Sequence, residues 1–199
     1  MKKYKLTDET IYFNGRTLHR IVAIRSFGSI IEGRKGGWIE KEENLSHEGN
    51  CWVYNNAFVY DNAQILNNAK ISNNVEIFGH ALIFDNTLIF DNTKIYDCAS
   101  IHGNTKIKGN TEIFGCVSIS GDITIINAKI SDIKDYIVFK NWWSSGRYFI
   151  WTRSNNMWIV GCFYGTGDEL IKKAYADSED KGKHYEEIVE YVNKCVLKK

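Results

Sequence analysis

The segment NTKIKGNTEIFGCVSI, residues 104–119, repeats a six-residue pattern in which an isoleucine is followed by a polar corner. The pattern extends on both sides and gives twelve consecutive hexads from Asn50 to Gly121. The fourth position is isoleucine or valine in all twelve, and the second is alanine, threonine, valine or cysteine. Asparagine, aspartate and glycine predominate where hexads meet, and these residues accept turn conformations at low cost.

This spacing predicts a parallel β-solenoid. Small and β-branched residues that alternate and break every six residues do not form an amphipathic helix, and hairpins have longer, less regular strands. Each hexad is then one side of a triangular coil, so twelve hexads give about four coils that rise by ~4.8 Å each. The second and fourth positions are expected to point inward.

The pattern resembles the hexapeptide-repeat family, whose phrase is [LIV]-[GAED]-x-x-[STAV]-x. Residues 101–106 (IHGNTK) and 107–112 (IKGNTE) match this phrase in turn. The resemblance implies a mainly β protein, a left-handed parallel β-helix. It leaves the function open, because the family includes both acyltransferases and non-catalytic scaffolds.

The flanking segments predict caps on both ends of the solenoid. Residues 1–49 are interpreted as a short β cap, because an open solenoid end is an unpaired edge. The hexad at 122–126 has lost one residue, which predicts that the regular β-helix of residues 50–132 ends there. Residues 133–199 predict a small α+β cap of three strands and two helices, with a capping box from Thr166 to Glu169.

The composition is that of a soluble globular protein. The net charge is +1, which gives no reason to expect nucleic acid or an anionic membrane as a partner. Apolar runs are shorter than the ~20 residues of a membrane helix, and the N-terminal residues lack a signal-peptide core. Five cysteines without a framework spacing favour a reducing cytoplasm. No cofactor is predicted.

Two segments resemble proteins encoded by phages and prophages. They are the leader GGWIEKEENLSHEGNCWVY (36–54) and the tail GCFYGTGDELIKKA (161–174). This resemblance implies a viral protein in the cytoplasm of a bacterial host. It also implies a host protein as partner, for instance a component of a defence system that the chain would inhibit.

Two histidines in the hexads are the candidates for catalysis. Acyltransferases of the hexapeptide-repeat family use a histidine as general base in a cleft between subunits, with acetyl-coenzyme A bound along the solenoid. His80 occupies the first position of its hexad and His102 the fifth. No loop interrupts the hexads to build an acceptor pocket, so a coenzyme-A-dependent acyltransferase is the alternative rather than the first hypothesis.

One corner of the prism combines soft ligands. His80, Cys98 and Cys116 all occupy the first position and lie 18 residues apart, so they are expected to stack roughly 5 Å apart. Imidazole and thiolate are zinc ligands, and the two cysteines are also candidates for a disulfide. A straight row lacks tetrahedral geometry and a fourth ligand, which favours plain corner residues without a metal.

One side of the prism is predicted to carry a continuous aromatic column. It consists of four fifth-position residues, with Phe58 beside its start: Tyr60, Phe78, Tyr96 and Phe114. An exposed column of this size exceeds the apolar patch that monomers usually show to water. The sequence therefore predicts an interface. A homo-oligomer, a trimer by default, the chain's own tail, or another protein would cover it.

The C-terminal segment combines aromatic residues with cations. The candidate ligand-binding residues are Trp142, Trp143, Arg147, Trp151 and Arg153. Aromatic rings stack on bases and a helix N-terminus attracts phosphate, so a protein that sequesters a nucleotide or small anion is a further alternative. Asp168 and Glu169 would compete with such an anion. The first hypothesis remains a non-catalytic protein that acts by protein–protein interaction.

Overall fold

The computed structural model covers residues 1–199 and describes all of them except 142–145 and 197–199. The chain forms two compact units, Met1–Asp135 and Tyr136–Lys199. In the part of the chain that the structure describes, no helix is both long and apolar enough to cross a membrane.

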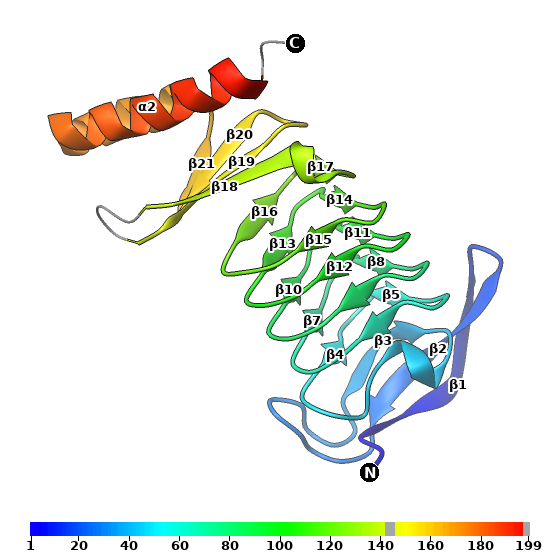
Figure 1. The fold of residues 1–199 in the computed structure, drawn as a ribbon. Coiled ribbons are helices and arrows are strands. Elements are labelled where there is room, and N and C mark those ends of the chain that lie inside the picture. The colour runs from blue at the N-terminus through cyan, green and yellow to red at the C-terminus, as the bar shows by residue number, and fades with distance from the viewer. Residues whose placement is uncertain (142–145, 197–199) are drawn as a thin grey trace. The chain divides into compact units, whose positions relative to one another are not determined.

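The first unit is a parallel β-solenoid of about five turns, in which the coils stack as shown in Figure 1. Short strands of successive coils align into three sheets, called faces 1 to 3. The left-handed sense of the coil stays a prediction. Face 1 has the order β1 (Tyr4–Phe13), β2 (Arg16–Ala23), β3 (Lys35–Ile39), β5 (Phe58–Val59), β8 (Glu76–Ile77), β11 (Lys94–Ile95), β14 (Glu112–Ile113) and β17 (Lys129–Ile130).

The other two faces contain strands of the hexads alone. Face 2 consists of β4 (Trp52–Val53), β7 (Lys70–Ile71), β10 (Leu88–Ile89), β13 (Lys106–Lys108) and β16 (Thr124–Ile126). Face 3 consists of β6 (Gln64–Ile65), β9 (Leu82–Ile83), β12 (Ser100–Ile101) and β15 (Ser118–Ile119). Two 3₁₀ turns, Glu42–Asn44 and Ile133–Asp135, lie near the two ends of the coils.

The inside of the solenoid is filled by the two positions that the sequence predicts. All twelve fourth-position side chains, from Val53 to Ile119, have an exposed fraction of 0%. The second-position residues are also buried, and their small size fits where the sides converge. Parallel pairing places isoleucine on isoleucine, as in Ile77, Ile95 and Ile113. The core is therefore a set of stacked columns of like side chains.

The backbone conformation at the corners explains which residue types occupy the sixth position of each hexad. All twelve sixth-position residues have a positive φ, and each is asparagine, aspartate or glycine. At Gly79, φ is +68° and an added Cβ would lie 2.9 Å from the backbone nitrogen of Asp97 on the next coil. The Gly79 N–H donates to Asp61 Oδ2 at 3.2 Å. The same aspartate–glycine pair recurs at Asp85 and Gly103, Asp91 and Gly109, and Asp97 and Gly115.

The solenoid begins before Asn50, so the structure adds a coil to the four that the sequence predicts. Trp38 and Ile39 pair in parallel with Phe58 and Val59, and Leu45 bridges to Ile65. These partners lie 20 residues apart, since 59 − 39 = 20, whereas Val53 and Ile71 lie 18 apart. Two inserted residues hide this coil from the hexad pattern.

At the other end the predicted one-residue loss is confirmed. Lys106 pairs with Thr124 at a separation of 18, but Glu112 pairs with Lys129 at a separation of 17. Asn127 absorbs the change with a φ of 51°, and its Oδ1 accepts a hydrogen bond from the Asn110 N–H at 2.9 Å. The pairing therefore continues across the shortened hexad.

The second unit is an antiparallel sheet with two helices. The strands are β18 (Tyr136–Lys140), β19 (Tyr148–Thr152), β20 (Met157–Val160) and β21 (Phe163–Gly165), followed by α1 (Gly167–Asp177) and α2 (Glu179–Val196). The sequence predicts three strands, and β21 is the fourth. It arises because Gly161, at a φ of +61°, turns the chain back onto β20.

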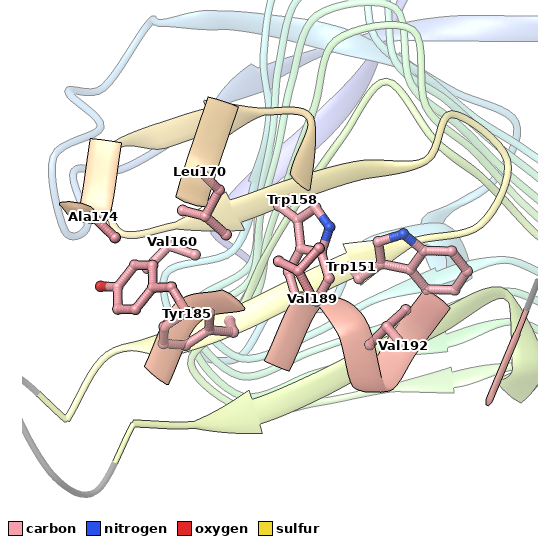
Figure 2. Packing of buried hydrophobic residues seen from close by; sticks show 9 residues of the cluster. Trp151, Trp158, Val160, Leu170, Ala174, Tyr185, Val189 and Val192 are labelled. Carbon is pink, nitrogen blue, oxygen red and sulfur yellow. The ribbon is translucent and has the colours of Figure 1, made fainter. Parts of the chain in front are cut away.

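Figure 2 shows the core of the second unit, where side chains of the sheet and both helices meet. Trp151 and Trp158 are each 1% exposed, and Tyr185 and Val189 of α2 belong to the same cluster. The predicted capping box is confirmed, because Thr166 Oγ1 accepts from the Glu169 N–H at 3.3 Å. Predicted turn residues 144 and 145 lie outside the described part of the chain.

Candidate binding surfaces

The aromatic column of face 1 is continuous. Tyr60, Phe78, Tyr96 and Phe114 stack with ring centroids 5.1, 4.9 and 5.1 Å apart, and their planes deviate by 1° to 6° from parallel. The spacing follows from the strand separation of the sheet. The rings are therefore spaced by the backbone ladder that carries them.

The N-terminal hairpin of β1 and β2 covers the start of this column. Phe13 stacks on Phe58 at 4.5 Å and meets the edge of Tyr60 at 6.1 Å. Tyr60 is consequently 3% exposed and belongs to a buried cluster with Leu18 and Trp38. Three half-buried rings, Phe78, Tyr96 and Phe114, remain beyond it.

A charged row runs beside the aromatic column. It consists of third-position residues of alternating sign on successive coils: Glu76, Lys94, Glu112 and Lys129. Lys94 Nζ lies 2.9 Å from Glu76 Oε2, and Lys129 Nζ lies 3.1 Å from Glu112 Oε2. This row is not among the sites predicted from the sequence, although its residues recur at the period of the coil. The alternating sign of the charge on successive coils is the feature of the sequence that indicates it.

Hydrogen bonds connect the column to the row. The Tyr96 hydroxyl donates to Glu112 Oε1 at 2.6 Å, and this bond raises the pKa of Tyr96 to about 12. The Tyr96 and Lys129 bonds hold the pKa of Glu112 below its usual range. Near the hairpin, Tyr60 donates to the buried Glu76 carboxylate, which also accepts from Asn14 Nδ2 at 3.1 Å.

The two histidines lie on face 3 in different settings. His80 is exposed, and among the described residues its side chain has no hydrogen bond or ion pair. His102 is half-buried and stacks on Phe84 with centroids 4.7 Å apart. Its Nδ1 lies 3.9 Å from Asp85 Oδ2, beyond hydrogen-bond distance. The structure therefore gives His102, rather than His80, a neighbouring carboxylate.

At the cysteine corner, the parallel register of face 3 places His80, Cys98 and Cys116 at equivalent positions on successive coils. Cys98 and Cys116 are exposed free thiols, and Cys116 is close enough to raise the pKa of Cys98. Within the described residues, no group of three histidine, cysteine, aspartate or glutamate side chains could hold a metal ion. The corner thus brings the two thiols together without His80 completing a ligand set.

Asparagine ladders occupy the polar corners. Each amide donates to the amide one coil further on at 3.0 to 3.4 Å, through Asn50, Asn68, Asn86 and Asn104 and through Asn74, Asn92 and Asn110. An open hollow at one of these corners has a volume of about 620 Å³ and is lined by asparagine, aspartate and glycine. Because the amides hydrogen-bond to one another, they link adjacent coils.

Of the predicted ligand-binding residues of the second unit, the three that the structure describes, Arg147, Trp151 and Arg153, lie in different settings. Trp142 and Trp143 lie outside the described residues. Trp151 belongs to the core, where its Nε1–H donates to Asn156 Oδ1 at 2.9 Å, and Arg153 is exposed in the turn. Arg147 lines a small pocket with residues of α1 and α2.

Comparison with known proteins gives one partial match. No family model matches the chain. An alignment 63 positions long, which covers 28% of the chain, is 40% identical to a protein of Escherichia coli (strain K12) described as the uncharacterized acetyltransferase YdcK. The match covers 19% of that relative, so the chain spans about a fifth of its length. This similarity and the β-solenoid both fit the hexapeptide-repeat family.

Proposed function

We propose that the chain is a non-catalytic binding protein that docks another protein on face 1. The observation that supports this proposal is the row of three half-buried rings, Phe78, Tyr96 and Phe114, beside a charged row of alternating sign. Aromatic residues dominate the centres of protein interfaces, and charges at the side set orientation.

The rigidity of the face favours binding. Each of β8, β11 and β14 is paired on both sides, so the ring positions are fixed before a partner arrives. A preformed surface avoids the cost of ordering side chains, about 0.5–1.5 kcal/mol for each immobilised group. The contacts of the hairpin residue Phe13 are with Phe58 and Tyr60, at the start of the column. The middle of the column therefore stays accessible to a partner.

The resemblance to phage and prophage proteins supports a bacterial host protein as the partner, for instance a component of a defence system. A homo-oligomer, with a trimer as the default, is the other occupant of this face. In either case the contact needs no cofactor. The two occupants differ in the mass of the complex that forms through the column.

Photo-crosslinking in bacterial cells tests the proposal. A benzophenone amino acid replaces Phe78 or Phe114, and in the control it replaces Ser120, an exposed fifth-position residue on face 3. We expect one discrete adduct from both column positions and none from Ser120. In a second experiment the benzophenone amino acid replaces Tyr96, and Phe78→Ser with Phe114→Ser should lower the yield of its adduct at least tenfold, by loss of about 1.4 kcal/mol or more. Equal adduct patterns from face 1 and face 3 would contradict the proposal.

A coenzyme-A-dependent acyltransferase is the second candidate. It is favoured by the partial match to an acetyltransferase and by Asp85, 3.9 Å from His102, as the group that would orient the imidazole. Thermal unfolding with and without ~1 mM acetyl-coenzyme A decides between the two, because a ligand of the folded state raises Tm. A saturable rise, with acetyl transfer that His102→Ala abolishes and His80→Ala retains, would establish the enzyme.

A further inference from the structure

We infer that the second unit binds a phosphate group in the pocket formed by Arg147, Lys173 and Lys181. This inference does not depend on the docking function of face 1. The pocket has a volume of about 90 Å³ and lies among residues of the sheet, α1 and α2. Its apolar floor consists of three buried residues, Val160, Leu170 and Ala174.

The charges around the pocket do not cancel. Three cationic side chains line it against one carboxylate, Asp177. Asp177 forms a close ion pair with Lys181, which holds the pKa of Asp177 below its usual range. Among the described residues, Arg147 and Lys173 have no carboxylate within 4 Å. Two positive charges therefore remain for a ligand.

Neighbouring groups position the cations. Arg147 lies against Gly161, where an added Cβ would come 3.1 Å from Arg147 Cδ and 3.3 Å from one guanidinium nitrogen. The glycine thus leaves room for the arginine stem. Lys173 Nζ lies 5.6 Å from the centroid of the Phe163 ring, and Lys181 Nζ lies 5.7 Å from that of Tyr185. Such cation–π contacts hold an ammonium group without neutralising it.

The size and chemistry select the ligand class. Pockets for whole drug-sized ligands have roughly 300–1,000 Å³, so this pocket accommodates one acidic group rather than a nucleotide. A guanidinium presents a planar fork that matches phosphate oxygens, and a lysine adds a point charge. An apolar floor strengthens these interactions by lowering the local dielectric. The group is a phosphate, either free or at the end of a small ester.

The sequence also predicts Arg147 as a residue that binds a small anion. The other residues of that predicted site differ from those that line the pocket. Lys173 and Lys181 are on the helices, and the sequence gives no signal that brings them to β19. The contact depends on the turn at Gly161 and on the packing of α1 against the sheet. Trp151, the tryptophan of the same prediction that the structure describes, does not line this pocket.

Calorimetric titration of the full chain tests the inference. Inorganic phosphate and adenosine monophosphate are titrated separately at constant ionic strength, with chloride as the balancing anion. We expect saturable binding with one site per chain. Arg147→Gln and Lys173→Gln should each weaken it at least tenfold. Lys172→Gln is the matched control, because Lys172 is an exposed neighbour on α1 outside the pocket.

Each result of the titration supports or contradicts the phosphate site. Phosphate binding with a similar affinity for both ligands supports a site for the phosphate group alone, and tighter binding of the monophosphate identifies an ester. Circular dichroism of the variants shows that the unit is folded, and Arg147→Lys should recover part of the affinity. No saturable binding of either ligand by the unmodified chain would overturn the inference, as would an equal loss in Lys172→Gln.

Discussion

The two units of the chain form their cores in different ways. In the solenoid, Ile77, Ile95 and Ile113 occupy equivalent sites on successive coils and stack on one another. In the second unit, Trp158 and Tyr185 each occupy a site that occurs once. A repeated core distributes stability over many equal contacts, whereas a unique core concentrates it in a few large side chains.

The comparison predicts that the largest single effect lies in the second unit. Trp158→Ala removes a side chain that is 1% exposed and contacts the cluster shared by the sheet and both helices. We expect a loss of about 3–5 kcal/mol in the free energy of unfolding of this unit. Hydrogen exchange should show lost amide protection across residues 136–196, with protection of residues 50–121 retained.

Tyr191→Ala is the matched control for that experiment. Tyr191 is an aromatic residue of α2 but is 56% exposed, so its removal should cost less than about 1 kcal/mol. Equal losses for the two variants would show that the unique core does not dominate. A loss of protection in the solenoid as well would show that the two units unfold together.

The corners of the solenoid predict the next largest effect. Gly79→Ala introduces a Cβ at a φ of +68° and 2.9 Å from the backbone of the next coil. We expect a cost of about 2–3 kcal/mol, because the strain of a left-handed conformation adds to a contact that backbone atoms cannot relieve. Denaturant unfolding followed by circular dichroism measures the change.

Gly15→Ala separates the two causes. Gly15 has a φ of +80°, but no atom lies within 4 Å of its added Cβ. This variant should cost about 1 kcal/mol, the conformational part alone. If both variants cost the same, the close approach between coils contributes nothing, and the regular alternation of aspartate and glycine needs another explanation.

Loss of the N-cap of α1 is predicted to have a moderate effect on stability. Thr166→Ala removes the acceptor for the Glu169 N–H and breaks the capping box of α1. We expect a loss of about 1 kcal/mol. Thr166→Ser keeps the hydroxyl and should retain most of the stability. Thermal unfolding of both variants measures the difference, and a similar loss in both would assign the effect to the threonine methyl group instead.

The two units also differ in how much of their structure can be predicted from the sequence. The hexad positions predict the buried columns and the stacked rings because each side repeats the same local pattern. The first coil escapes prediction, since two inserted residues shift Ile39 and Leu45 out of the hexad register. The contact of Phe13 with Phe58 spans 45 residues and has no local signal in the sequence. The placement of Lys173 and Arg147 in one pocket likewise has no local signal.

The smallest effect concerns the charged row, where the solenoid repeats polar rather than apolar contacts. Glu112 accepts from Tyr96 and pairs with Lys129, and its side chain is 35% exposed. Its pKa in the folded state is lowered, so its contribution to stability is present above the usual carboxyl pKa and disappears as the pH falls through the folded value. Because solvent screens the pair, Glu112→Gln should cost about 0.5 kcal/mol at neutral pH and less than that at about pH 3. Denaturant unfolding at both pH values measures this difference, with Glu48→Gln as the exposed control. A loss that persists fully in acid would mean that Glu112 acts through packing of its aliphatic stem and not through charge.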